Sequence, residues 1–212
     1  MPPEQCPPSL RNRVRHGRNA QPARISTLRF PPRPVRRPQL EHVTLEVGRR
    51  NDLEYFYIIG SAANLAVVPD PPEWALNVTR DADVISPHQD DALSDRISRV
   101  LGESIEVDIE HGYYVQGVSR STPAFAPQGR EQRANPVRVQ TRHTGLCMEP
   151  HDLVIGKLGA GREKDLEFAR AVADLGILHR VVLLERLALV KTNGAHSRLI
   201  AARIEGFFSK IG

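Results

Sequence analysis

A glycine-serine pair separates a strand-like run from a helix-like run, which indicates an α/β organisation. The run 54–59 (EYFYII) is rich in aromatic and branched residues and predicts a buried strand. Gly60-Ser61 ends that strand, and residues 62–68 (AANLAVV) predict a short helix that stops at Pro69. Backbone N–H groups and a hydroxyl at the start of a helix form a natural cradle for phosphate, although a Gly-Ser pair alone is more often only a turn.

Two aspartates follow about 20 residues later, on a second predicted strand. In 78–85, alternation places Thr79, Asp81 and Asp83 on one face, and aspartates two positions apart have Cα atoms about 7 Å apart. Two carboxylates near 4 Å repel by about 4 kcal/mol at an effective dielectric constant of 20, so their convergence requires a proton, an arginine or a cation. Mg²⁺ or Mn²⁺ suits such oxygen ligands, and the alternative is a solvated polar face.

A third acidic residue is expected from the segment 105–110 (IEVDIE). Its apolar residues alternate with acidic ones, which predicts a further strand with one acidic face. Asp108 is the residue expected to converge with the aspartate pair. Glu106 and Glu110 share its face and remain alternatives.

The whole pattern predicts an α/β (α+β) fold with one small mixed sheet, flanking helices and a C-terminal helical part. A chain of 212 residues allows one ordinary domain, expected at 41–212, with the sheet within about 52–145 and the helical part within about 150–212. The expected strands are near 54–59, 78–85, 105–110 and 136–141, and the expected helices are near 87–101, 152–158, 162–175 and 181–190.

The first 40 residues differ sharply from the rest in composition. They hold nine arginines and nine of the 17 prolines against one acidic residue, so their net charge is +8 and that of residues 41–212 is −4. A segment rich in proline and like charge does not bury enough apolar surface to offset its ordering entropy, and we expect 1–40 to be a disordered tail. It is a solvated extension, an arm that binds nucleic-acid phosphates or, as the least favoured interpretation, a targeting peptide, which lacks the apolar stretch of a secretory signal.

Several familiar classes of protein are excluded. The Gly-Ser turn lacks the spacing and the lysine of a P-loop, and the chain contains no Gly-x-Gly-x-x-Gly fingerprint. The histidines lack zinc-site spacing, and Cys6 and Cys147 indicate neither a disulfide framework nor a metal site. No apolar run approaches the roughly 18 residues of a membrane span. We therefore expect a cytoplasmic protein without a membrane partner.

Three stretches together resemble the nucleotidyltransferase fold of the DNA polymerase beta-like superfamily. They are 58–63 (IIGSAA), 79–84 (TRDADV) and 151–166 (HDLVIGKLGAGREKDL), and 112–118 (GYYVQGV) is a further family-like stretch. The chain is similar to a mostly uncharacterised prokaryotic branch that is related to abortive-infection toxin nucleotidyltransferases. The resemblance covers about residues 52–190.

The resemblance implies a role for each candidate residue. Gly60 and Ser61 would hold a triphosphate. The metal ligands would be Asp81, Asp83 and Asp108, which would also be catalytic. Nucleotide contacts are expected from Lys157, Arg162, Lys164 and Asp165, with Lys157 also catalytic.

The spacing of two of these residues sets a condition on the fold. In a continuous helix, Lys157 and Asp165 would be about 12 Å apart, so both can serve one triphosphate only if Gly159 and Gly161 break the helix between them. The alternative is a solvated charged face in which Arg162 pairs with a carboxylate.

The implied activity is metal-dependent transfer of a nucleoside monophosphate from a nucleoside triphosphate to RNA, tRNA or a protein. A toxin-like or defence-associated role with a cognate antitoxin or toxin partner is one hypothesis. The alternative is a catalytically silent protein of this fold that acts as a binding or antitoxin-like partner.

Overall fold

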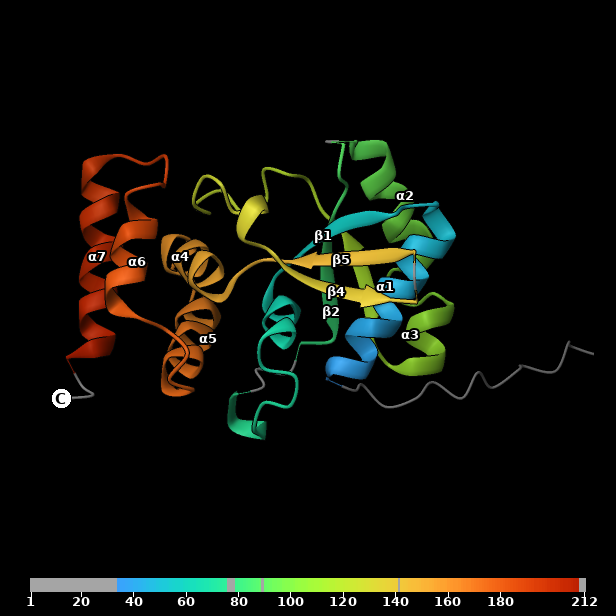
Figure 1. Ribbon diagram of the computed structural model, residues 1–212, viewed down its shortest axis with the longest axis horizontal. Helices are drawn as coiled ribbons and strands as arrows, with labels where there is room; N and C mark the ends of the chain where they lie inside the picture. Colours follow the sequence, from blue (N-terminus) through green and yellow to red (C-terminus); the bar gives the residue numbers. More distant parts are fainter. Residues whose placement is uncertain (1–33, 76–78, 89, 141, 210–212) are drawn as a thin grey trace, which may run out of the picture.

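The computed structural model describes residues 34–209 apart from 76–78, 89 and 141 (Figure 1). Its α-helices are α1 (Arg37–Asn51), α2 (Asp91–Leu101), α3 (Glu106–His111), α4 (Pro150–Ala160), α5 (Glu163–Asp174), α6 (Arg180–Leu187) and α7 (Gly194–Phe208). Its strands are β1 (Tyr55–Ile59), β2 (Asp81–Ile85), β3 (Tyr114–Gly117), β4 (Asn135–Val139) and β5 (His143–Cys147). Short 3-10 helices are η1 (Ser61–Ala66), η2 (Glu73–Ala75) and η3 (Glu131–Arg133).

The strands form one mixed sheet with the order β3-β2-β1-β5-β4. β1 runs antiparallel to β2 and parallel to β5, β2 and β3 are parallel, and β4 and β5 are antiparallel. The register pairs Ile59 with Asp83 and Asp83 with Gln116. Directly paired residues share a face of the sheet, so these three residues lie on one face, which is the face of the predicted carboxylates.

The opposite face of the sheet is covered by helices. α1 packs on β4 and β5, and α2 packs on β3. Fully buried side chains on this face include Phe56, Ile58, Val84 and Cys147. Each large apolar side chain buried in this way contributes about 1.5–3 kcal/mol, so this layer holds the sheet firmly beneath the carboxylates. The aromatic and branched composition of residues 54–59 therefore reflects this burial.

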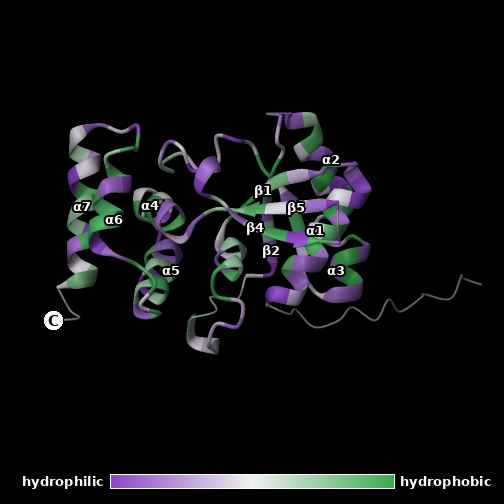
Figure 2. Cartoon of the chain, in the orientation of Figure 1, coloured by the Kyte–Doolittle hydropathy of each residue, from purple (hydrophilic) through white to green (hydrophobic). Residues whose placement is uncertain are grey.

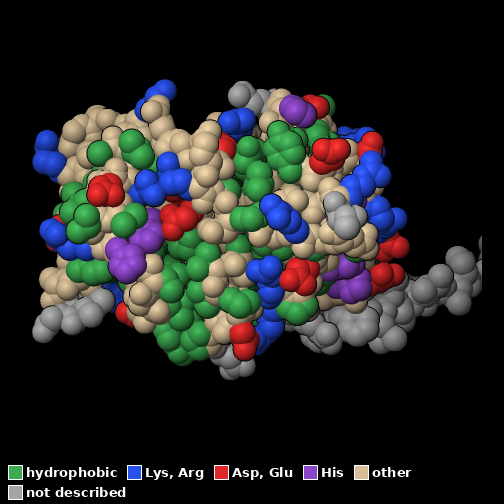
Figure 3. Space-filling view, viewed as in Figure 1, with side chains coloured by type: hydrophobic (Ala, Val, Ile, Leu, Met, Phe, Trp, Pro, Cys, Tyr) green, Lys and Arg blue, Asp and Glu red, His purple; other side chains and the backbone are tan. Residues whose placement is uncertain are grey.

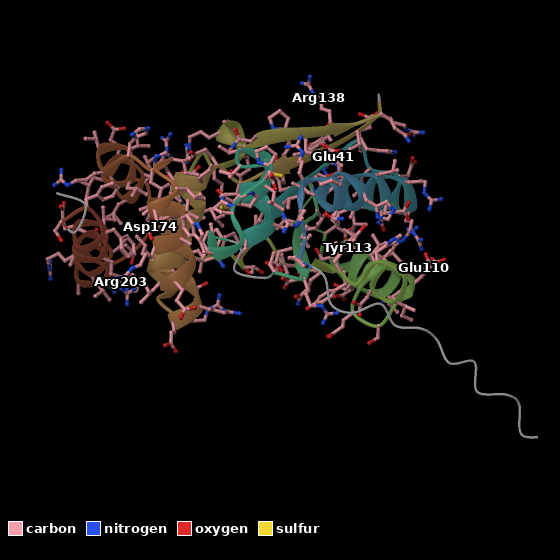
Figure 4. All side chains as sticks on the ribbon, turned by 90° about the horizontal axis from the view of Figure 1, so that it is seen from below. Glu41, Glu110, Tyr113, Arg138, Asp174 and Arg203 are labelled. Atoms are coloured by element: carbon pink, nitrogen blue, oxygen red, sulfur yellow. The ribbon has the colours of Figure 1, made fainter. Side chains whose placement is uncertain are left out.

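The carboxylate face is only partly covered. The segment between β3 and β4 crosses it, and a small apolar cavity lies between the two. Tyr57, Ile85 and Leu146 of the sheet line this cavity, with Arg120 and Arg130 of the crossing segment. Arg138 projects from β4 away from the body of the molecule (Figure 4).

The helices after residue 150 form a separate layer beside the sheet (Figure 1). α4 packs against α5, α6 and α7, and α6 and α7 form the outer pair. Hydrophobic and hydrophilic segments alternate along α6 and α7 (Figure 2), because one stripe of each helix faces the core. Among the described residues, no helix combines the length and the apolar character required for a membrane span.

The expected fold class is confirmed: a mixed sheet is flanked by helices and followed by a helical part. The expected strand at 105–110 is wrong, because residues 106–111 form the helix α3. Gly112 ends this helix in the left-handed conformation, and its N–H donates to the carbonyl of Asp108. Strands β3 and β5 and the separate helix α7 were not expected from the sequence.

The boundary of the folded part also needs correction. Residue 40 was the expected end of the tail, but α1 begins at Arg37. Val35 and Leu40 are buried in the core, and the Val35 N–H donates to the Thr79 carbonyl at 2.9 Å. The fold therefore includes residues 34–40, while the rest of the expected tail lies outside the described residues.

Candidate active site

The turn after β1 is fitted closely to the carboxylate of Asp83. Gly60 has φ 71° and ψ −173°, a conformation that is essentially restricted to glycine. A Cβ atom at this position would lie 2.4 Å from Oδ2 of Asp83. Glycine is therefore required both by the backbone angle and by the approach of the carboxylate. Ser61, the next residue, lines the cleft at the start of η1.

Asp81 and Asp83 lie on the same face of β2, as predicted. Both are half-buried, whereas Ala82 between them is completely buried. The Thr79 hydroxyl donates a hydrogen bond to Oδ1 of Asp81. Among the described residues, no donor forms a hydrogen bond or an ion pair with the carboxylate of Asp83. Burial and the neighbouring Asp81 raise the pKa of Asp83 to about 6, although Lys157, Lys164 and Arg162 act in the opposite direction.

A helix break brings the cations of the C-terminal part together. Gly161, at φ 67°, ends α4, and α5 begins two residues later. As a result, Nζ of Lys157 lies 3.1 Å from Oδ1 of Asp165, and Nε of Arg162 lies 2.6 Å from Oδ2. The helix is therefore broken between the two residues, as the sequence spacing required, but by Gly161 alone, because Gly159 lies within α4. The second pair also gives Arg162 the carboxylate partner that the alternative interpretation expected.

Asp165 acts in this structure as the anchor of the two cations. It is fully buried. Burial raises the pKa of Asp165, but the hydrogen bonds from Arg162 and Lys157 outweigh this effect and hold it below its usual range. Its carboxylate therefore remains charged and fixes Lys157 and Arg162. We call Lys157, Arg162 and the exposed Lys164 of α5 the helical cations.

Two adjoining hollows meet at these residues. The larger is an open, polar cleft of about 1390 Å³, lined by Ser61, both aspartates and all three helical cations. The smaller, of about 610 Å³, is more apolar and is lined by Pro123, Phe125 and Leu153. Asp83, Lys157 and Arg162 line both. A ligand with a charged end and an apolar ring would fit across this junction.

Asp108 does not join the aspartate pair. It lies on α3 rather than on a strand, is fully buried, and accepts a hydrogen bond from Nη2 of Arg80 at 2.7 Å. The Ser104 N–H donates to its other oxygen at 2.9 Å. Its expected role as a metal ligand is therefore corrected to that of a buried partner of Arg80. In the adjacent strand β3, the residue paired with Asp83 is Gln116.

The remaining carboxylates still fit a divalent cation that shares its coordination with a substrate. Among the described residues, no group of three or more His, Cys, Asp or Glu side chains is arranged to hold a metal ion. Mg²⁺, however, is often bound through one or two carboxylates together with substrate phosphates and water. Asp81 and Asp83 could supply these carboxylates, with Gln116 as a neutral oxygen donor in the same cleft.

Several residues of the cleft were missed from the sequence. Arg80 and Tyr114 line its edge, and Thr122 lies in both hollows. Arg80 and Tyr114 lie in the stretches 79–84 and 112–118, which resemble the family, and this position could have indicated that they belong to the site. Thr122 and Phe125 come from the long loop, where no sequence pattern indicates which residues face a site.

The fold and the cleft define an α/β protein in which two strand carboxylates face a wall of cations, an arrangement suited to a phosphorylated ligand. The family described as nucleotidyltransferase of unknown function (DUF6036) matches residues 39–193, and the chain belongs to this family. Membership confirms the nucleotidyltransferase family expected from the sequence and indicates nucleotidyl transfer with a nucleoside triphosphate as substrate. Comparisons with curated proteins and with solved structures find no match.

Proposed function

We propose that the chain is a metal-dependent nucleotidyltransferase that transfers a nucleoside monophosphate to an acceptor hydroxyl. The proposal depends on one observation: the Gly60-Ser61 turn, the aspartate pair and the helical cations lie around one cleft. In this step the acceptor oxygen attacks the α-phosphorus. Pyrophosphate leaves with the electron pair of the broken P–O bond, and the hydroxyl proton passes to water.

The helical cations and the turn would bind the triphosphate. Lys157 and Arg162 are fixed by the buried Asp165, so they offer charge at a defined place without reorganising when the substrate binds. Lys164 has no ion-pair partner among the described residues and lines the same cleft. Ser61 would contribute its hydroxyl from the start of η1. The apolar smaller hollow would receive the nucleoside.

Asp81 and Asp83 are the residues that would hold Mg²⁺ or Mn²⁺. The fit rests on the unpaired carboxylate of Asp83, because burying a charge in this way is costly unless a cation neutralises it. The bound cation would supply charge neutralisation at the phosphates and lower the pKa of the attacking hydroxyl. The protein's part is to hold both carboxylates on a rigid strand.

The acceptor and the biological role come from the resemblance alone. RNA, tRNA and a protein side chain are all acceptors of this chemistry. The relation to the DNA polymerase beta-like superfamily and to abortive-infection toxins stays a prediction, as does a cognate antitoxin or toxin partner.

The test is transfer by the full-length protein. The protein is incubated with α-³²P-labelled nucleoside triphosphates, Mg²⁺, and either total RNA or a cell lysate. We expect a labelled product that requires Mg²⁺, survives Asp95→Asn on the exposed face of α2, and is lost in Asp83→Asn. A wild-type protein that labels nothing with any of the four nucleotides would contradict the proposal.

A second candidate is a catalytically silent binding protein of the same family. Two observations favour it: Asp108 is committed to Arg80, and Gln116 stands beside Asp83 where a third carboxylate would be expected. Calorimetric titration separates the candidates, because an enzyme should bind nucleotide more tightly with Mg²⁺ and a silent protein should bind it equally with and without the metal.

A further inference from the structure

Arg80 is a second, separately anchored cation in the larger cleft. It leads into β2 beside Tyr114 of the edge strand β3, and its guanidinium carbon lies 5.9 Å from the centre of the Tyr114 ring. Nη2 donates to Asp108 at 2.7 Å, and Nε donates to the Gly112 carbonyl at 3.4 Å. An arginine carries five N–H donors, and no other described residue accepts from the remaining three. We call Arg80 and Tyr114 the sheet-edge pair.

The buried carboxylate of Asp108 holds this guanidinium in place. Asp108 is fully buried, while the side chain of Arg80 is 27% exposed, so the pair presents a fixed cation to the cleft. A buried carboxylate is costly unless it is paired and hydrogen-bonded, and Asp108 has both kinds of partner. Arg80 is therefore preorganised in the same manner as Lys157 and Arg162.

The two groups of cations line different parts of the hollows around the aspartates. The helical cations act on Asp83, whereas the charges that act on Tyr114 are those of Asp81, Glu103, Arg80 and Asp108. Two of the helical cations also line the smaller hollow, but the sheet-edge pair lines only the larger cleft. The cleft is thus lined by the cations at α4 and α5 and, separately, by Arg80 just before β2, beside β3.

We propose that the sheet-edge pair is an acceptor subsite for a phosphate-bearing nucleotide of a nucleic acid, with Asp108 as its positioning residue. The proposal rests on the proposed function. The acceptor must attack from the side opposite to the leaving pyrophosphate. If the helical cations hold the leaving group, the acceptor approaches the aspartates from the sheet edge.

The chemistry of the pair favours a nucleotide over a protein side chain. A planar guanidinium with free donors binds a phosphate through two parallel hydrogen bonds. The half-buried Tyr114 ring beside it offers a surface on which a base or an arginine plane can stack. An acceptor serine, threonine or tyrosine carries neither a phosphate nor a base. The nearby Glu103 disfavours a longer run of phosphates at this place.

Direct binding tests the subsite without requiring any transfer. The full-length protein is titrated into a 5′-fluorescent, single-stranded RNA of mixed sequence, and anisotropy is followed at several salt concentrations. We expect Arg80→Gln to weaken binding about tenfold and to lower the slope of log K against log salt by about 0.7, the value for one phosphate contact on a single strand. Arg138→Gln, at the opposite edge of the sheet, should change neither quantity. The arginines before residue 34 are common to all variants, so the differences report on the sheet edge.

The double variant Arg80→Gln/Asp108→Asn keeps the test valid if Arg80→Gln alone fails to fold, because it leaves no unpaired buried charge. It should lose the same affinity and the same salt dependence. Binding and salt slope that match those of wild type in a folded Arg80 variant would overturn the proposal.

Transfer kinetics test whether the sheet-edge pair binds the acceptor while the helical cations bind the triphosphate. Arg80→Gln and Asp108→Asn should each raise KM for the RNA acceptor about tenfold and leave KM for the nucleoside triphosphate within twofold, whereas Lys164→Gln should do the reverse. If Asp108 had only a structural role, Asp108→Asn would instead lower kcat and weaken the binding of both substrates. A rise in KM for the triphosphate in Arg80→Gln, or label on protein rather than RNA, would overturn the proposal. Wild type that binds RNA through Arg80 but transfers nothing would support the subsite and contradict the proposed function.

Discussion

Gly60 is the residue on which the position of the Asp83 carboxylate most directly depends. We expect Gly60→Ala to lose at least about 1–2 kcal/mol, because its backbone conformation is unfavourable for any residue with a Cβ atom. Transfer should be abolished as well, since the new Cβ displaces Oδ2 of Asp83. Urea unfolding and the labelled-transfer assay measure the two effects.

Gly176→Ala is the matched control for this change. Gly176 also has a positive φ of 72°, but a Cβ added there meets nothing within 4 Å. It should therefore lose stability while transfer is retained. Full activity of Gly60→Ala would show that the carboxylate does not need the space that this glycine leaves.

Asp83 gives the site a dependence of stability on pH. Its folded pKa of about 6 lies above the usual 3.8, so the ionised group opposes folding at neutral pH by about 3 kcal/mol, since one pKa unit corresponds to about 1.4 kcal/mol. As pH falls from 6 towards 4, the folded state takes up the proton first and wild type gains this stability. We expect metal-free Asp83→Asn to be more stable than wild type by about 3 kcal/mol at pH 7.5 and equal to it near pH 4.

Urea unfolding with a chelator present, at several pH values, measures this difference. The same variant should lack transfer, so Asp83 would lower the stability of the wild type at neutral pH while being required for its activity. Mg²⁺ should stabilise wild type and not the variant. A variant that is less stable than wild type at pH 7.5 would contradict the assignment of an unpaired, half-buried carboxylate.

At the scale of elements, one buried ion pair fastens the loop over the site to the helical layer. Arg133 donates to both oxygens of the fully buried Asp152 of α4, at 2.8 and 3.0 Å. Arg186 of α6 contacts the same carboxylate at 3.4 Å. The segment before Arg133 carries Phe125, whose ring stacks on His196 of α7 at 4.6 Å. Loop and helices are therefore joined at two places.

Arg133→Gln should loosen this loop. We expect a loss of about 3 kcal/mol, because removing one partner leaves a buried carboxylate incompletely compensated. Thermolysin should cleave within residues 119–134 several times faster, as mapped by mass spectrometry. Arg138→Gln on the neighbouring strand β4 removes an exposed arginine and should leave both quantities unchanged. Equal cleavage rates in the two variants would mean that the ion pair does not restrain the loop.

Elements and site residues differed in how far the sequence could predict them. The strand 54–59 was predicted correctly from its aromatic and branched residues, and the shared face of Asp81 and Asp83 from the alternation along their strand. The segment 105–110 carries the same alternation but is too short to distinguish a strand from one and a half turns of helix. Its true conformation depends on the capping Gly112 and on a long-range pair with Arg80. Such tertiary contacts leave no local pattern.

The residue composition of the surface does not distinguish the site from its surroundings either. Lys and Arg side chains are scattered among acidic and apolar ones over the visible face rather than gathered into one patch (Figure 3). The charge of the cleft is set by ion pairs: buried Asp165 fixes Lys157 and Arg162, and buried Asp108 fixes Arg80. Charge counts along the chain therefore could not locate it.

At the scale of the whole molecule, the N-terminal boundary can be tested by two truncations. Deletion of residues 1–33 should reduce salt-sensitive RNA binding, because it removes seven arginines. It should leave the unfolding midpoint unchanged, because the composition of this segment predicts that it contributes no core residue.

Deletion of residues 1–40 also removes the buried Val35 and Leu40, the start of α1 and the hydrogen bond to the Thr79 carbonyl. Burial of two such side chains is worth about 4 kcal/mol, a large share of the roughly 5–15 kcal/mol that stabilises a domain. The longer deletion should also impair transfer, because it removes a hydrogen-bond partner of Thr79, whose hydroxyl donates a hydrogen bond to the carboxylate of Asp81. Equal stability of the two truncated proteins would place the start of the fold after residue 40, as composition alone predicts.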